Sequence, residues 1–193
     1  MDREARSKGQ SPVANPAEFV IVPKPTPPRS HIVTSKELAL LINALPSGMR
    51  PIIELAYETA MRRTEITRLR LRDLHLSERF LDVIHGKEGD RSVPLTSRAC
   101  ELLAEAQKGL KHPNARLFPV APHSVTTAVR RARRDAGLDE DVRIYQLRHT
   151  RCTIVAKKGF NQAQIMMVIG QRDSRSVQRY THLNVKDVID ILD

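Results

Sequence analysis

The segment Asp73–Leu95, DLHLSERFLDVIHGKEGDRSVPL, has a different hydrophobic period from the sequence on either side of it. Its apolar residues recur every second position, as in half-buried strands, whereas the flanking sequence repeats them every three or four positions. Three short strands are predicted, at Leu74–Leu76, Phe80–Ile84 and Arg91–Leu95, with His85–Asp90 as the last turn. The fold is therefore predicted to be mainly α with a small three-stranded antiparallel sheet (α+β).

Helices are expected on both sides of these strands. Thr34-Ser35-Lys36-Glu37 is a capping box before an apolar repeat, and Pro51 suits the first turn of the next helix. A third helix is predicted at Thr64–Leu71. Further helices are predicted at about 97–109, 124–136, 146–158, 162–169, 174–181 and 185–192, with Asn161 and Gln164 capping one of them.

The first 30 residues differ in composition from the rest. They hold six of the 12 prolines and no helical period, which is typical of an extended linker or arm, with Phe19–Val22 as a candidate short strand. Residues 31–193 are expected to form one domain, because no second core or internal repeat is visible.

Charge points to a polyanionic partner. The 193-residue chain carries a net charge of +10 and has a pI of about 10.1, which favours nucleic acid over the alternative of a merely basic protein. Aromatic residues make up only 4%, which favours duplex phosphates over stacked single-stranded bases. Cys100 and Cys152 are expected to be reduced core thiols. Without a membrane-spanning run or signal peptide, we expect a cytoplasmic, DNA-associated protein.

A tyrosine lies among arginines near the end of the sequence, in Ile169–His182, IGQRDSRSVQRYTH. A phenol with a pKa of about 10 is a poor nucleophile unless nearby cations and hydrogen bonds stabilise its phenolate. Arg172, Arg175 and Arg179 could supply such charge to Tyr180, and they would also attract a phosphodiester. The stretch therefore places a candidate nucleophile among cations that would also attract a phosphodiester.

The spacing Gly170-x9-Tyr180-x-His182 resembles the nucleophile box of the tyrosine recombinase (phage integrase) family. Thr59–Ile66 is similar to the first arginine box of that family, with Arg62 as the catalytic arginine, and Tyr145–Thr150 is similar to the second, with Arg148. Lys87, in the turn before the last strand, resembles the hairpin lysine of the same family.

Two positions depart from the family pattern. Tyr145 stands where histidine is commonest, and Gln171 follows the glycine where histidine or tryptophan is usual. Both can donate hydrogen bonds to a phosphoryl oxygen, but neither titrates near neutral pH as an imidazole does. We expect slower chemistry with a flatter pH dependence.

The resemblance implies a site-specific recombinase acting on double-stranded DNA without metal, ATP or other cofactor. Tyr180 would form a 3′-phosphotyrosyl link, Arg62 and Arg148 would stabilise the developing charge, and Lys87 would protonate the departing 5′ oxygen. The resemblance covers about residues 30–193. It leaves out the core-binding domain that usually precedes them, so either a fragment or a shortened protein is expected. Two alternatives stay open: a type IB topoisomerase and a non-catalytic DNA-binding relative.

Two further features bear on partners. Arg130, Arg131, Arg133 and Arg134 near a helix end either contact DNA phosphates or form a solvated helix face. An apolar stripe of Val185, Val188, Ile189 and Leu192 either packs on its own domain or docks on a neighbouring copy. The resemblance favours docking, and with it self-association on DNA as a synaptic tetramer.

Overall fold

The computed structural model describes residues 31–84, 86 and 89–170 of the 193-residue chain. The elements before and including the sheet are α2 Ser35–Ala44, η1 Ser47–Met49, α3 Arg50–Thr59, α4 Arg63–Ile66, η2 Leu71–Asp73, β1 Leu74–His75, β2 Phe80–Val83 and β3 Arg91–Pro94. After the sheet come α5 Ser97–Ala106, α6 Pro122–Asp135, α7 Ile144–Lys157 and α8 Gln162–Ile169.

The residues predicted to begin helices make the expected contacts in the structure. The Thr34 hydroxyl accepts the Glu37 N–H at 3.2 Å, and the Glu37 carboxylate accepts the Thr34 N–H at 2.8 Å, which closes the capping box of α2. Pro51 lies in the first turn of α3. Asn161 and Gln164 cap α8, whose bounds match the predicted helix at 162–169.

The prediction of a helix at Thr64–Leu71 is wrong beyond its first turn, because α4 ends at Ile66. The chain then turns at Thr67 and Arg68, and residues 69–72 lie beside the loop that follows α5. The Leu71 N–H donates to the Ala115 carbonyl and the Leu117 N–H donates to the Leu69 carbonyl, both at 3.0 Å. Pairing with a distant segment therefore satisfies the backbone groups that a longer helix would have paired internally.

The three-stranded sheet is confirmed, with the antiparallel order β1-β2-β3. Leu81 lies opposite both Leu74 and Val93, and Leu81, Val83 and Val93 are buried. Their alternation along the strands is the period of two seen in the sequence, and it turns one face of the sheet toward the core.

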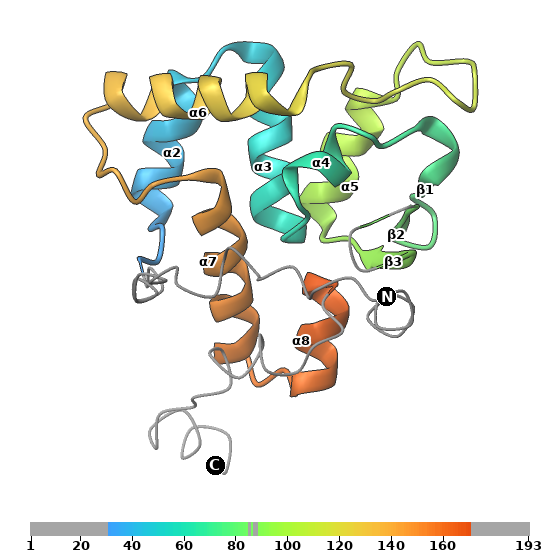
Figure 1. Cartoon of the computed structure of the whole chain (residues 1–193). Helices are drawn as coiled ribbons and strands as arrows, with labels where there is room; N and C mark the ends of the chain where they lie inside the picture. The colour runs from blue at the N-terminus through green and yellow to red at the C-terminus, as the bar shows by residue number, and fades with distance from the viewer. Residues whose placement is uncertain (1–30, 85, 87–88, 171–193) are drawn as a thin grey trace, which may run out of the picture.

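Helix α3 lies at the centre of the helical packing. It packs against α5 and α7, while α2 packs against α6 and α7 against α8 (Figure 1). The last described helix, α8, also reaches β3, so the hairpin and the end of the described chain meet. Cys152 is buried between α7 and α8 as expected, whereas Cys100 is half-buried, and the two form no disulfide.

Several predictions concern residues outside the described ranges. They are the arm at 1–30, the helices at 174–181 and 185–192, and the residues Lys87, Gln171 and Tyr180. Within the described ranges, no helix combines the length and apolar character that crossing a bilayer requires.

Candidate active site

Two arginines predicted to act together lie on the same cavity. Arg62 at the start of α4 and Arg148 in α7 line a hollow of about 300 Å³, together with Tyr145 from the first turn of α7. The remaining lining residues are Met61, Arg63, Thr64 and Ile144. The fold thus brings both arginine boxes to one place.

Arg62 is positioned by the turn between α3 and α4. Ala60 ends α3 in the left-handed region, with φ of 54°, and redirects the chain. Arg62 then occupies the N-cap of α4 in an extended conformation, with φ of −71° and ψ of 145°. Its guanidinium Nη1 donates to Glu65 Oε1 at 3.2 Å, which holds the side chain against its own helix.

Glu65 is the centre of the hydrogen-bond network around Arg62. One carboxylate oxygen, Oε2, accepts the backbone N–H of Arg62 at 2.8 Å, and both oxygens accept from the guanidinium of Arg91 at 2.9 Å. The Glu65 side chain is only 4% exposed, so this paired, bidentate arrangement is shielded from water.

Arg91 comes from the first residue of β3 and lies beneath the end of α8. A Cβ atom added to Gly170 would approach Arg91 Nε to 1.9 Å, and Gly170 itself has φ of +60°. Both the space and the backbone conformation therefore suit glycine at this position. Through this contact the hairpin, α4 and the residue before Gln171 share one packed junction.

Arg148 ties three helices together. Its Nη1 donates to the carbonyl of Ala60 at the end of α3, and its Nη2 donates to the carbonyl of Ile169 at the end of α8. Only 7% of Arg148 is exposed. A planar fork can bridge two carbonyls in this way, whereas a single ammonium could not hold the same geometry.

The electrostatics of this cluster favour an anion. Burial lowers the pKa of Arg148 below its ordinary value, and the charges of Arg62 and Arg91 act in the same direction, while Cys152 and Glu65 oppose it. For Glu65, burial by itself would raise the pKa. The hydrogen bonds and charge of Arg91, with those of Arg62, outweigh burial and hold the pKa below its usual range.

Three guanidinium groups thus surround one carboxylate. The excess positive charge beside a 300 Å³ hollow suits a ligand that carries its own negative charge, such as a phosphodiester.

Tyr145 lies at the mouth of the hollow, with 59% of its surface exposed. Another lining residue, Arg63, donates to the hydroxyl of Thr126 and so connects α4 to α6. The cavity is therefore lined both by arginines held in hydrogen bonds and by one solvent-exposed phenol.

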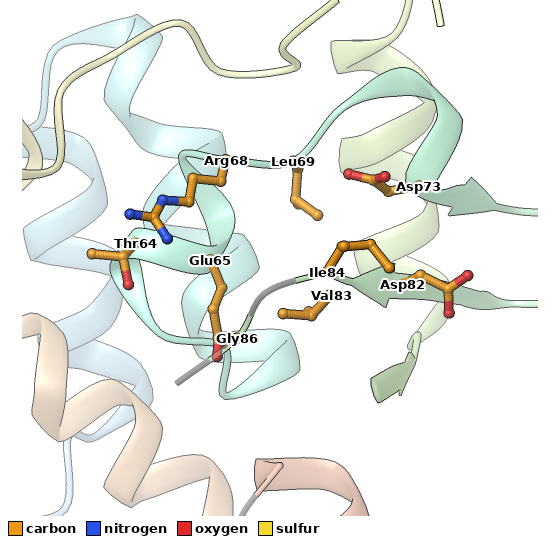
Figure 2. A pocket seen from close by; sticks show the side chains of 9 residues that line it. All are labelled: Thr64, Glu65, Arg68, Leu69, Asp73, Asp82, Val83, Ile84 and Gly86. Carbon is orange, nitrogen blue, oxygen red and sulfur yellow. The ribbon is translucent and has the colours of Figure 1, made fainter. Parts of the chain in front are cut away.

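A second hollow, of about 180 Å³, lies on the other side of α4, between α4 and β2 (Figure 2). Figure 2 shows Glu65 running from α4 toward Gly86, which lies next to Lys87 in the hairpin turn. Gly86 therefore lies close to the Glu65 network.

Sequence reasoning missed Glu65 and Arg91. Glu65 stands three residues after Arg62, the spacing of a capping box, and that signal was present in the first arginine box. Arg91 shares the inward face of β3 with buried Val93, and a charge on the core face of a strand indicates a buried partner. The identity of that partner is not readable from the strand.

The arginines of α6 divide between two roles. Arg133 is half-buried and its Nη1 donates to the Glu140 carbonyl at 2.6 Å, so it fastens the turn after α6. Arg130, Arg131 and Arg134 are exposed. Both interpretations of these exposed arginines, DNA contacts and a solvated face, remain predictions. Among residues 31–84, 86 and 89–170, no cluster of three or more His, Cys, Asp or Glu side chains is suited to a metal ion.

The chain is similar in sequence to curated tyrosine recombinases. The chain is 28% identical over 161 residues to the tyrosine recombinase XerD of Listeria innocua, covering 74% of this chain and 54% of the relative. It is 30% identical over 138 residues to the tyrosine recombinase XerA of Saccharolobus solfataricus, covering 71% of this chain and 46% of the relative. The chain thus spans about half the length of these curated relatives.

Solved structures agree on the fold. The crystal structure of a XerA recombinase matches with a TM-score of 0.67 and 25% identity, over 86% of this chain and 65% of that one. A lambda integrase dimer bound to a COC′ core site matches with a TM-score of 0.70 and 19% identity, over 93% of this chain and 55% of that one. The predicted mainly helical fold with its small sheet is confirmed.

The sequence also matches the phage integrase family over residues 31–187, which is most of the chain. Together with the two arginine boxes meeting at one cavity, this match shows that the chain belongs to the phage integrase family.

Proposed function

We propose that the chain cleaves and rejoins DNA strands as the catalytic part of a site-specific recombinase. In this proposal the Tyr180 phenol releases its proton to solvent and its oxygen attacks a backbone phosphorus, forming a 3′-phosphotyrosyl bond while the bond from phosphorus to the 5′ oxygen breaks. Lys87 donates the proton that the departing 5′ oxygen takes up. Rejoining is the reverse attack by a 5′ hydroxyl, so the energy of the phosphodiester stays in the covalent link.

The two arginines are proposed to stabilise the charge that develops on the non-bridging oxygens. Arg62 and Arg148 lie on one cavity although they come from different helices, and this convergence is the observation that carries the proposal. Arg148 is held by the backbone carbonyls of Ala60 and Ile169, so its guanidinium is oriented before any DNA arrives. Preorganised donors of this kind contribute more to the transition state than to ground-state binding.

Tyr145 and Gln171 are proposed to donate hydrogen bonds to the phosphoryl group in place of an imidazole. The exposed position of Tyr145 on the same cavity supports that role for its hydroxyl. Because neither side chain is an imidazole, the rate of cleavage should change little between about pH 6 and 8 on account of these two residues.

The test is covalent capture of DNA. Nicked duplexes from a randomised pool release the short strand that rejoining needs, so a cleaving enzyme remains attached to them under denaturing conditions. The wild-type chain should give a covalent complex and Tyr180→Phe should give none, while both bind DNA equally, because only the hydroxyl is removed. Attachment that survives in Tyr180→Phe would overturn the assignment of the nucleophile. Binding with no attachment in either chain would favour the non-catalytic relative.

The arginines are tested in the same assay. Arg62→Ala should lower the cleavage rate about 10²–10³-fold, as removal of one oxyanion donor does, with a much smaller change in affinity. Equal reductions in rate and affinity would instead make Arg62 an ordinary phosphate contact. Self-association on DNA through Val185, Val188, Ile189 and Leu192 stays a prediction, measured by the sedimentation of DNA complexes of a chain that lacks residues 184–193.

A further inference from the structure

A second group of arginines lies away from the 300 Å³ cavity. Arg68, Arg70, Arg72 and Arg116 line a hollow of about 430 Å³ with Asp73 and Ile84, and we call these four side chains the arginine basin. Four guanidinium groups here meet one carboxylate, a local excess of three positive charges. Burial and packing do not account for such an excess, because Arg68, Arg72 and Arg116 are exposed.

The backbone that carries the basin is paired by hydrogen bonds between two segments of the chain. The extended residues after α4 run antiparallel to the loop that follows α5, with Arg70 bridged to Arg116. The Arg72 N–H donates to the Pro113 carbonyl at 3.0 Å, and the Arg70 side chain donates to the Asn114 carbonyl at 2.8 Å. The two segments therefore hold the backbone of Arg70, Arg72 and Arg116 in fixed relative positions.

The positive charges of the basin repel one another. Like charges directly opposite each other across an antiparallel pair are destabilising, and Arg70 and Arg116 are such a pair. Asp73 is the basin's one carboxylate, and its Oδ2 is already engaged by the Arg70 backbone N–H at 2.8 Å. Within the described ranges, the guanidinium groups of Arg68 and Arg116 make no hydrogen bond or ion pair, so their donors can bind an anion.

The basin opens next to the hairpin. Arg68, Asp73 and Ile84 also line the 180 Å³ hollow of Figure 2, which extends to Gly86. The carboxylates of that neighbouring hollow already have partners, since Glu65 binds Arg91 and Asp82 binds His75 and Ser92. On this side of the protein the donors available to an anion are therefore those of the basin, and Gly86 lies in the adjoining hollow.

From these observations we propose that the arginine basin binds a backbone phosphate of double-stranded DNA outside the cleaved position. Arginine forks suit phosphate oxygens, and the basin presents several on a rigid support. The inference rests on the proposed function, because it takes the bound polyanion to be DNA. It adds a contact that fixes the register of the duplex and takes no part in the chemistry.

The experiment compares the salt dependence of binding to a random-sequence duplex. Arg68→Gln/Arg116→Gln removes two charges that have no partner in the described structure. Lys36→Gln/Lys157→Gln removes the same charge from exposed positions on α2 and α7, away from the basin. Removing one phosphate contact should flatten the slope of log affinity against log salt by about 0.9. We expect the slope of the basin variant to flatten by about 0.9 or more and that of the control to match the wild type.

Two further measurements separate loss of the basin from loss of the fold or of DNA binding. Arg68→Lys/Arg116→Lys keeps the charge and should recover most of the slope, and thermal unfolding should show all variants folded. Basin and control variants with the same slope would overturn the basin but leave the proposed function standing. A wild-type chain without affinity for duplex DNA would overturn the proposed function and the basin with it.

Discussion

Glu65 accepts four of the hydrogen bonds that hold the candidate site together. Its carboxylate accepts from the backbone and side chain of Arg62 and, through both oxygens, from Arg91. A buried carboxylate with so many donors is stable only as an anion, and the guanidinium groups around it are stable only with that anion present. Glu65 thus both positions Arg62, the arginine proposed to act in catalysis, and contributes to the stability of the domain.

Glu65→Gln should therefore destabilise the domain strongly. An amide of the same shape leaves Arg62 and Arg91 without their counter-charge, and breaking a buried ion pair in this way costs about 3–5 kcal/mol. Chemical denaturation at neutral pH measures this cost. The control Glu105→Gln removes an exposed carboxylate that pairs with exposed Lys108, and it should leave the unfolding curve unchanged.

The effect of Glu65 depends on pH with a fixed sign. Its pKa is lower in the folded chain than in the unfolded chain, where it is about 4.3. The stabilisation is therefore complete above about pH 4.3 and disappears as the pH falls through the lower, folded value. The gap in unfolding free energy between wild type and Glu65→Gln should stay constant from about pH 7 to 5 and narrow in stronger acid. A gap that widened in acid would contradict the assigned pairing.

At the scale of elements, the end of α8 is locked onto the hairpin. Gly170 caps α8 in the left-handed region and lies against Arg91, while the Ile169 carbonyl accepts from Arg148. The helix end thus touches both the Glu65 network and the second arginine box. In the sequence, the predicted nucleophile box continues directly from this point.

Gly170→Ala should weaken the docking of α8 by two separable effects. An alanine at φ of +60° is strained, by about 1–2 kcal/mol, and its Cβ would displace the Arg91 side chain. Gly137→Ala is the matched control, because Gly137 has φ of +62° and nothing within 4 Å of an added Cβ. Thermal unfolding should show a larger destabilisation for Gly170→Ala than for Gly137→Ala. Equal destabilisation would mean that Arg91 moves aside at no cost.

At the scale of the whole molecule, the first described residues, 31–33, are held against α7. The Val33 N–H donates to the Thr150 hydroxyl at 2.9 Å, and the Gln146 amide donates to the His31 carbonyl at 3.0 Å. Val33 is also buried, with 2% of its surface exposed. Residues far apart in the sequence therefore share one packed unit from residue 31 onward.

Truncation tests where that unit begins. A chain that starts at residue 31 should unfold at the same temperature as the full chain, because the proline-rich segment before it is predicted to be an extended linker or arm. A chain that starts at residue 35 lacks buried Val33, its bond to Thr150 and the Thr34 cap of α2, and it should unfold several degrees lower. A large destabilisation on removing residues 1–30 alone would show that the arm belongs to the domain.

The sequence alone determined the elements whose causes are local. The capping boxes of α2 and α8, Pro51 in α3, and the period of two along β2 and β3 all act between residues a few positions apart, and each is readable from the chain. The pairing of Arg62 with Arg148 as one site also came from the sequence, through their order and spacing in a family pattern. The structure places both on one cavity.

Only the tertiary structure decided the contacts between distant segments. The helix predicted at Thr64–Leu71 gave way to pairing with Ala115 and Leu117, and Glu65 found Arg91 across the fold. A charged residue at a core position in the sequence indicates that a partner of opposite charge is needed, but it does not identify that partner. Packing and desolvation in the folded chain determine which residue becomes the partner, and that residue can be far away in the sequence. The arginine basin arises in the same way, from two segments that the fold brings side by side.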